Sequence, residues 1–290
     1  MSSKRLIAVL GATGVQGGAV VRYLSTQPEY EVRGLTRNSD GKAAKELAQL
    51  PNVSMVKAHF NDPMSLRKAF EGVEAVYALT NFYDAENQSN KAQEAQQGMM
   101  IADVAKETGV KFLIWSTVPS AFLRTKGKFE APRLVENKFY VSAYLKQIKM
   151  PHVDMYLGFY YENWASFHQL SVDSDGAIEL VQPWAILKTY RTRPDLLGDA
   201  VYCVGGFHST ADVAREIQKQ TGKQTRVVTA PTSGFEDLDI MFGYYNQYSL
   251  YNEFPIPTEE AQQLGIRFHT MEDFVREGAV PHIKKLVQSK

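Results

Sequence analysis

Cysteine is almost absent from this chain of 290 residues, which contains only Cys203. A single thiol excludes a disulfide within the chain and is typical of proteins that work in a reducing compartment. Cys203 lies in an apolar stretch, so we predict a small buried side chain and not a redox switch. We expect a cytoplasmic protein, with the nucleus as a second location.

Long hydrophobic runs and an excess of charge of one sign are also missing. No apolar run approaches the roughly 20 residues that a membrane-spanning helix needs, and the apolar stretch after Arg5 is too short for a signal peptide. The 32 Lys and Arg residues balance 32 Asp and Glu residues, whereas a protein that binds duplex DNA through its phosphates usually carries a basic excess. We therefore expect neither a membrane nor a nucleic acid as a direct partner.

Motifs for metal binding and for hydrolysis are lacking as well. The six histidines include no pair at i and i+4 and have no cysteine at ligand spacing, so we predict no metal site. The chain has no G-x-S-x-G sequence, which argues against a serine hydrolase. The composition, with 44% hydrophobic and 22% charged residues, is typical of a folded globular protein with a sizeable core.

Strand-like and helical patterns alternate along the first half of the chain. Apolar runs that predict buried strands cover residues 6–10, 31–36, 53–58, 75–79 and 112–116, and helical patterns separate them. Strands that alternate with helices form right-handed βαβ crossovers and a parallel sheet. We therefore predict an α/β fold: a doubly wound Rossmann-type parallel sheet with a smaller, interwoven C-terminal α/β lobe.

The second half of the chain has a less regular pattern. Further strands are expected near residues 153–158 and 201–204. Because no linker rich in Ser or Gly is visible, the smaller lobe is expected to be interwoven with the larger one. We expect a first domain over residues 1–155, to which the two later strands return, and a smaller lobe over residues 156–290 that closes a cleft.

A glycine-rich turn, Gly11-Ala-Thr-Gly-Val-Gln-Gly-Gly18, lies between the first predicted strand and the first predicted helix. Gly11, Gly14 and Gly17 give the spacing G-x-x-G-x-x-G, which differs from the G-x-G-x-x-G of ordinary NAD dehydrogenases. Glycines let the backbone approach a pyrophosphate closely, and the helix N-terminus presents unpaired N–H groups and a partial positive charge to it. The turn therefore predicts a dinucleotide site.

The end of the second predicted strand indicates which dinucleotide binds. NAD-specific sites place an acidic residue about 20 residues beyond the glycines, where its carboxylate accepts a hydrogen bond from the ribose 2′-hydroxyl. This chain has Arg37 and Asn38 there, and a guanidinium can hold a 2′-phosphate through two parallel hydrogen bonds. We predict that NADP(H) is preferred, with NAD(H) as a second option, because Asp40 can weaken the preference for the phosphate.

These motifs resemble the NmrA-like family, an atypical branch of the short-chain dehydrogenase/reductase superfamily. The resemblance is carried by the glycine turn, by Leu35-Thr36-Arg37, by Thr80-Asn81-Phe82, by the helical stretch 98–110 and by Tyr160-Tyr161-Glu162-Asn163. It covers about residues 5–165 well and the remainder loosely. It implies a Rossmann-type NAD(P)-binding protein.

The resemblance also implies cofactor contacts, position by position. From the pyrophosphate to the nicotinamide end, the expected contact residues are Gly11, Ala12, Thr13, Gly14, Val15, Gln16, Gly17, Arg37, Asn38, His59, Phe60, Thr80, Asn81, Phe82, Lys138, Tyr160, Tyr161, Glu162 and Asn163. Arg37 and Asn38 would meet the adenosine ribose. His59 and Phe60 would bracket the adenine, although many members of the family have Asp where this chain has His59. Lys138 would face the nicotinamide.

The tyrosine of an active short-chain dehydrogenase is missing from its usual position. Those enzymes use Tyr-x-x-x-Lys, in which the tyrosine supplies a proton and the lysine lowers its pKa. Here Leu134, which has no proton to give, stands four residues before Lys138. Lys138 is thus the one catalytic residue that we predict. Tyr160 or Tyr161 could substitute for the tyrosine. Ser116 or Thr117 could take the place of its usual serine partner.

Two functions stay open at this point. Some members of the family are redox-sensing regulators, including regulators of transcription, and others reduce small molecules with a lysine as the only acid or base. Leu134 favours an NADP(H)-binding regulator with a regulatory protein partner and little or no dehydrogenase activity. Lys138 favours the alternative, an NADPH-dependent reductase of a small enone, quinone or aromatic carbonyl. The sequence does not fix the oligomeric state.

Overall fold

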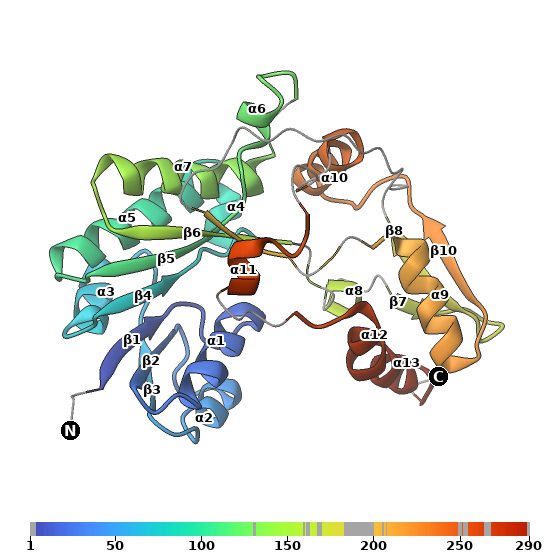
Figure 1. Ribbon diagram of the computed structural model, residues 1–290, viewed down its shortest axis with the longest axis horizontal. Helices are drawn as coiled ribbons and strands as arrows, with labels where there is room; N and C mark the ends of the chain where they lie inside the picture. The colour runs from blue at the N-terminus through green and yellow to red at the C-terminus, as the bar shows by residue number, and fades with distance from the viewer. Residues whose placement is uncertain are drawn as a thin grey trace. The chain divides into compact units, whose positions relative to one another are not determined.

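The computed structural model describes residues 4–129, 132–158, 160, 163–166, 170–182, 200–204, 206, 208–248, 251, 255–263 and 268–288. The chain divides into two compact units (Figure 1). The first unit consists of Met1–Ser120 and Arg133–Met155, and the second of Ala121–Pro132 and Tyr156–Lys290. Residues 121–132 therefore group with the second unit, although they interrupt the first one in the sequence.

The first unit is built on a parallel sheet. Its strands are β1 (Arg5–Val9), β2 (Tyr30–Thr36), β3 (Val53–Lys57), β4 (Ala75–Ala78), β5 (Phe112–Thr117) and β6, which begins at His152 and runs to Leu157. They lie in the order β3-β2-β1-β4-β5-β6. In register, Ile7 of β1 lies between Val32 of β2 and Ala75 of β4. The predicted doubly wound α/β fold is confirmed, and the strand order reverses between β1 and β4, where such sheets bind ligands.

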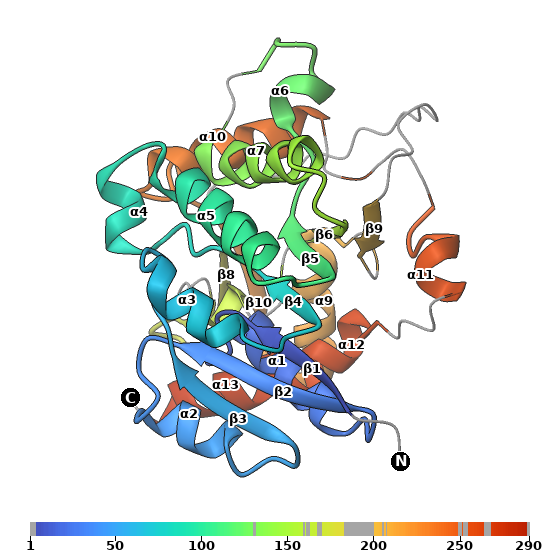
Figure 2. The same cartoon turned by 90° about the vertical axis from the view of Figure 1, so that its left-hand side faces the viewer.

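Helices cover both faces of this sheet (Figure 2). They are α1 (Val15–Ser25), α2 (Lys42–Leu47), α3 (Pro63–Phe70), α4 (Ala85–Ser89), α5 (Gln93–Glu107) and α7 (Arg133–Gln147). Successive side chains of β1 alternate between the faces. Ala8 packs into a core with α3, α5 and α7, and Ile7 packs into a second core with α1 and α2. Apolar residues on both sides of every inner strand explain the continuous apolar runs in the sequence.

Helices α5 and α7 approach each other closely at Gly98. A Cβ at this position would lie 2.5 Å from Cγ2 of Val141 and 3.2 Å from a ring atom of Trp115. Only glycine leaves room for this contact, because both neighbours are buried in the same core. The close approach also brings Glu94 of α5 and Lys138 of α7 together.

The second unit has a three-stranded sheet of its own. It contains β7 (Leu170–Val172), β8 (Ile178–Gln182) and β10 (Thr225–Thr229), in the order β10-β8-β7. Strand β8 is antiparallel to β7 and parallel to β10. A further strand, β9 (Ala200–Cys203), forms where the sequence predicted one.

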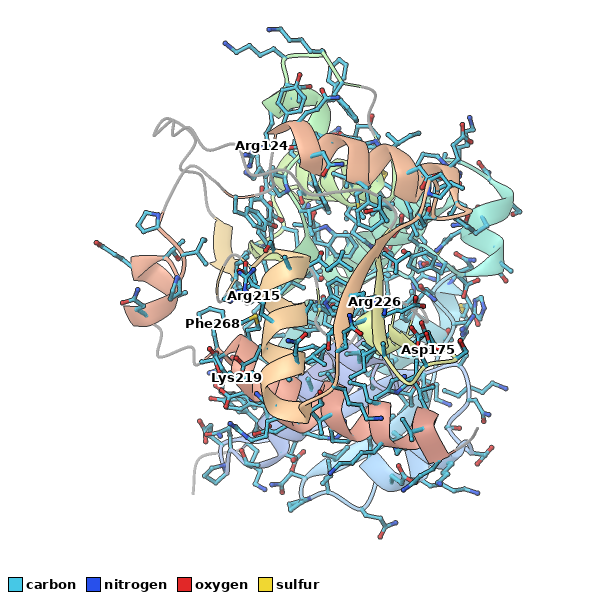
Figure 3. The ribbon with its side chains drawn as sticks, turned by 90° about the vertical axis from the view of Figure 1, so that its right-hand side faces the viewer. Arg124, Asp175, Arg215, Lys219, Arg226 and Phe268 are labelled. Atoms are coloured by element: carbon cyan, nitrogen blue, oxygen red, sulfur yellow. The ribbon has the colours of Figure 1, made fainter. Side chains whose placement is uncertain are left out.

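The second unit also contains helices. They are α6 (Ala121–Arg124), α8 (Asn163–Ser166), α9 (Thr210–Thr221), α10 (Glu236–Tyr248), α11 (Glu259–Gln263), α12 (Met271–Phe274), the π-helical turn η1 (Val275–Ala279) and α13 (Val280–Gln288). The inner face of α9 packs with β8 and η1 into one core. The exposed side chains of Arg215 and Lys219 (Figure 3) pair with Asp212 and Glu216. Within the described ranges, every helix is too short or too polar to cross a membrane.

Candidate functional site

The glycine turn joins the end of β1 to the start of α1, as the sequence predicted. Gly11 has a φ of +61°, in the left-handed region that favours glycine. A Cβ on Gly17 would lie 2.4 Å from the carbonyl oxygen of Gly11, so this position accepts only glycine without a shift of the backbone. The turn therefore requires glycine at both positions, and glycine lets the backbone come close to a phosphate.

The start of α1 has no side chain to satisfy its amides. Gly14 is the N-cap residue and makes no side-chain cap hydrogen bond, and the first turn contains no acidic residue. Most helices satisfy these amides with Ser, Thr, Asp or Asn at the N-cap. The N–H groups and the positive end of the helix dipole are thus left for an anion.

A cleft of about 390 Å³ opens beside this turn, entirely within the first unit. Its lining includes most of the residues that we predicted in this unit: Gly11, Thr13, Gly14, Val15, Gln16, Gly17, Arg37, His59, Phe60, Thr80 and Asn81. These residues follow β1, β2, β3 and β4, whose carboxyl ends meet at one edge of the sheet. The fold thus brings together side chains that lie far apart in the sequence.

Four predicted residues of the same unit lie outside this lining. Ala12 is fully buried, and its N–H donates to the carbonyl oxygen of Leu35 at 3.1 Å. Asn38 is exposed beside the cleft, where its N–H donates to Oγ1 of Thr36. The other two are Phe82, which is buried with the guanidinium of Arg133 over its ring, and Lys138.

The remaining predicted residues belong to the second unit. Tyr160 accepts a backbone hydrogen bond from Asn163, which begins α8. Tyr161 and Glu162 lie outside the described residues. The closing of this segment over the nicotinamide end stays a prediction.

Several residues of the lining were not predicted from the sequence. They are Leu35, Thr36, Leu79, Asp84, Glu86 and Gln97. Asp84 and Glu86 belong to a polar stretch that begins a few residues after β4, and a strand end in a parallel sheet is where ligand-binding side chains gather. Their position after a predicted strand was the feature of the sequence from which both carboxylates could have been predicted.

Charged pairs stand at the side of the cleft formed by the ends of β2 and β3. The guanidinium of Arg37 pairs with the carboxylate of Asp84, which also accepts a hydrogen bond from the N–H of Glu86 at 3.2 Å and so caps α4. The carboxylate of Glu86 lies 3.8 Å from Nε2 of His59 and accepts from Asn61. Arg37 thus meets a fixed carboxylate that follows β4, on the other side of β1.

Hydroxyl and amide groups line the middle of the cleft. Nε2 of Gln16 donates to Oγ of Ser116 at 2.7 Å and to the hydroxyl of Tyr77. Oγ1 of Thr13 lies 3.2 Å from Oγ1 of Thr36. Ser116, one of the predicted partners of a catalytic tyrosine, is therefore buried behind Gln16.

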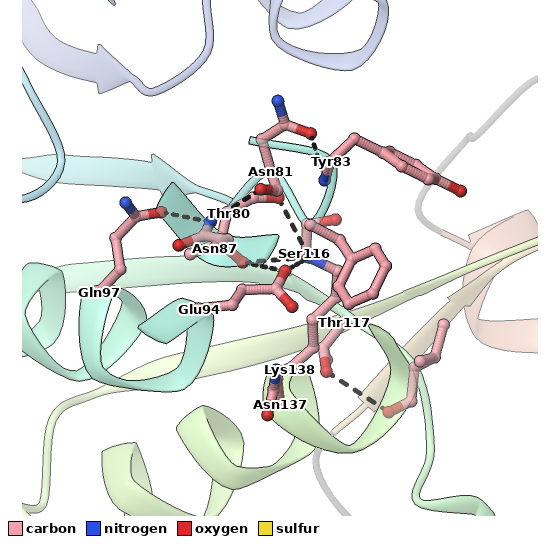
Figure 4. A network of polar contacts seen from close by, with 12 residues as sticks. Thr80, Asn81, Tyr83, Asn87, Glu94, Gln97, Ser116, Thr117, Asn137 and Lys138 are labelled. Atoms are coloured by element: carbon pink, nitrogen blue, oxygen red, sulfur yellow. Dashed lines mark hydrogen bonds and ion pairs between the residues drawn. The ribbon is translucent and has the colours of Figure 1, made fainter. Parts of the chain in front are cut away.

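Lys138 is held by a buried polar network (Figure 4). Its Nζ donates to the carbonyl oxygen of Thr80 at 3.1 Å, to Oγ1 of Thr80 at 3.0 Å and to Oε1 of Glu94 at 2.6 Å. An ammonium group has three N–H donors, so these contacts use all of them. The side chain of Glu94 is 1% exposed and that of Lys138 is 19% exposed. The pair therefore lies mostly inside the fold.

No group of three or more His, Cys, Asp or Glu side chains that could hold a metal ion occurs within the described ranges. The chemistry of the cleft therefore comes from backbone amides at the glycine turn, from the charged pairs around Arg37 and His59, and from the hydroxyl and amide groups between them.

Two curated relatives and one solved structure illustrate what the chain is similar to. It is 31% identical over 64% of its length to an NmrA-like family domain-containing protein of Dictyostelium discoideum, and 39% identical over 44% to an NmrA-like family domain-containing oxidoreductase of Aspergillus hancockii. These matches span 60% and 38% of the relatives' own lengths. The fold is similar to that of NmrA, a negative transcriptional regulator solved in complex with NADP, with a TM-score of 0.79, 22% identity and 98% of both chains covered.

The extent of the family match decides the assignment. The sequence model of the NmrA-like family aligns with residues 3–275, which include the glycine turn, the cleft and most of the second unit. The chain belongs to the NmrA-like family.

Proposed function

We propose that this protein binds NADP(H) in the cleft of the first unit and acts as a redox-sensing regulator with little or no dehydrogenase activity. The observation that carries the second part is the state of Lys138, whose three N–H donors are all engaged by Thr80 and Glu94. Leu134 stands where an active short-chain dehydrogenase has its tyrosine. The site therefore has a place for the cofactor and no free acid at the expected position.

The cleft fits a nicotinamide dinucleotide at its phosphates. The uncapped start of α1 and the close contact between Gly11 and Gly17 leave bare backbone facing the cleft. A pyrophosphate placed there would accept hydrogen bonds from the backbone amides and would be stabilised by the helix dipole. A bound dinucleotide would supply a transferable hydride, and the residues of the turn would hold and orient it.

The two ends of the cofactor would meet different surroundings. Arg37, His59 and Phe60 line the cleft beyond β2 and β3, where the adenosine would lie. Thr80 and Asn81 line it beyond β4, where the inner ribose would lie. NmrA was solved with NADP and also with NAD, which supports a nicotinamide dinucleotide here.

A regulator of this kind would work by differential binding. If a protein partner and the cofactor bind different conformations, each weakens the other by the same factor. The name of the NmrA structure, a negative transcriptional regulator, supports a partner that acts in transcription. Such a protein would be found in the cytoplasm and the nucleus.

The alternative is an NADPH-dependent reductase of a small enone, quinone or aromatic carbonyl. The oxidoreductase name of the Aspergillus hancockii relative supports it, and so does the contact between Lys138 and Thr80, which lines the cleft. A reductase would need Lys138 to free one of the three donors that Thr80 and Glu94 engage.

Binding and turnover measurements on the same preparation test the proposal. We expect calorimetric titration to show NADPH binding, and we expect no loss of NADPH absorbance above background with a panel of enones, quinones and aromatic aldehydes. Turnover that is lost in a Lys138→Ala variant shown by circular dichroism to be folded would establish the reductase instead. If the protein binds neither NADPH nor NADH, the proposal is wrong.

A further inference from the structure

The carboxylate of Asp84 pairs with Arg37, although the two residues lie on opposite sides of the glycine turn. Arg37 directly follows β2, and Asp84 lies a few residues beyond the end of β4. Because β2 and β4 are the two neighbours of β1, the Arg37–Asp84 pair joins the strand ends that flank the turn. Both residues line the cleft.

The two partners of this pair differ in how firmly they are held. The side chain of Asp84 is 16% exposed, whereas that of Arg37 is 62% exposed. Asp84 donates its N–H to the carbonyl oxygen of Asn81 at 3.1 Å and accepts from the N–H of Glu86. Arg37 can therefore turn toward another anion while Asp84 stays in place.

The fixed carboxylate has opposite effects on the two kinds of dinucleotide. A 2′-phosphate that binds Arg37 must displace the carboxylate of Asp84 from the guanidinium and lie near a like charge, which disfavours NADP(H). A free 2′-hydroxyl is a hydrogen-bond donor and finds a carboxylate acceptor in Asp84. NAD-specific sites usually provide that acceptor at the end of the second strand, where this chain has Arg37 and Asn38.

We infer that Asp84 is a specificity-determining residue, which accepts the ribose 2′-hydroxyl of NAD(H) and competes with the 2′-phosphate of NADP(H) for Arg37. This inference rests on the proposed binding of a dinucleotide in the cleft. In NAD-specific sites the carboxylate that accepts the ribose 2′-hydroxyl usually follows the second strand. Here that carboxylate would follow β4. The site then accepts both cofactors, with Arg37 contacting the phosphate and Asp84 the hydroxyl.

The test is a calorimetric titration of wild type and Asp84→Asn with NADPH and with NADH. Asparagine is as good an N-cap as aspartate, so α4 keeps its cap. The variant is expected to bind NADPH more tightly and NADH more weakly, and the ratio of the two affinities should rise by about tenfold, the value of one charge-assisted hydrogen bond. Asp84→Ser, which also keeps a capping oxygen, should shift the ratio in the same direction.

Asp40→Asn is the matched control. It removes the same charge three residues after Arg37, from an exposed position outside the cleft lining. The sequence suggested that Asp40 weakens the preference for the phosphate, but Asp40 lies outside the cleft lining. We therefore expect the affinity ratio of Asp40→Asn to equal that of the wild type.

The outcomes separate this inference from the proposed function. If wild type binds the cofactors and both Asp84 variants change the two affinities by the same factor, the inference is wrong and the proposed binding stands. If Asp40→Asn shifts the ratio as much as Asp84→Asn, the effect comes from net charge alone, which also overturns the inference. Binding of neither cofactor to wild type would overturn both.

Discussion

At the scale of single residues, the ion pair between Lys138 and Glu94 is a feature whose disruption has a large energetic consequence. Both charges are mostly removed from water, and Oγ1 of Thr80 donates to the same carboxylate oxygen at 2.8 Å. A buried charge that loses its partner costs far more than a surface charge does. Lys138 therefore stabilises the first unit whether or not it takes part in catalysis.

Lys138→Met is expected to lower the free energy of unfolding by about 3 kcal/mol, because it leaves the carboxylate of Glu94 buried without a cation. The measurement is urea denaturation followed by circular dichroism. Lys146→Met, an exposed position on the same helix, is the matched control and should change stability by less than about 0.5 kcal/mol. Equal effects of the two substitutions would show that the pair contributes no stability.

At the scale of elements, the turn between β1 and α1 determines whether the cleft can hold phosphates. Gly17 lies against the carbonyl oxygen of Gly11, so the first turn of α1 is pressed onto the end of β1. Any side chain at this position moves the amides of the helix away from the cleft. The whole element, and not one side chain, forms the anion site.

Gly17→Ala should therefore abolish the binding of NADPH and NADH alike and lower stability, because the new Cβ would lie 2.4 Å from the Gly11 carbonyl oxygen. Calorimetric titration and thermal unfolding measure the two effects. Gly243→Ala is the control, since a Cβ there would lie 3.4 Å from Phe129, an ordinary contact. Undiminished affinity in Gly17→Ala would contradict the phosphate-binding role of the turn.

A second prediction concerns the start of α12. The N–H of Thr270 donates to the carboxylate of Asp273 at 3.1 Å, and this bond, together with the side chains of Arg276 and Thr270, lowers the pKa of Asp273 to about 2. A lowered pKa in the folded state stabilises the fold above the unfolded value, 3.8, and that contribution is lost as pH falls toward 2.

Asp273→Asn should accordingly flatten the decrease in thermal stability between about pH 4 and pH 2. Melting temperatures measured across this range in wild type and variant provide the check. Parallel curves for the two proteins would mean that the capping carboxylate does not contribute to acid sensitivity.

Periodicity explains which elements were predictable from the sequence. The parallel strands and the helix α9, whose N-cap and C-cap are Ser209 and Gly222, have long apolar patterns and clear end signals. Strands β7 (Leu-Ser-Val) and β8 (Ile-Glu-Leu-Val-Gln) have polar residues between their apolar ones and so give no continuous apolar run, and α4 is polar after Ala85. Asp84 escaped prediction for a different reason: it contacts Arg37 only because β2 and β4 flank β1 in the folded sheet.

At the scale of the whole molecule, the described part of the chain contains separate apolar cores in its two units. The lining of the cleft comes from residues 11–97 alone, all in the first unit. The groups expected to contact the phosphates and the adenosine are therefore complete within one unit. Effects of cofactor binding should be strongest there.

Hydrogen exchange measured with and without NADPH tests this localisation. At a concentration of 100 times the Kd, NADPH should stabilise the protein by about 2.7 kcal/mol, and amides of residues 11–17 should exchange more slowly. The amides of α9 in the second unit should change less. Slowing that is uniform over the chain would contradict a site confined to the first unit.

The network around Lys138 also bears on what a lysine at this place in the chain signifies. Because the lysine ties α7 to Thr80 and to Glu94 on α5, holding these elements together accounts for its presence without any chemical step. The lysine alone is therefore no sign of turnover, which has to be established by assay.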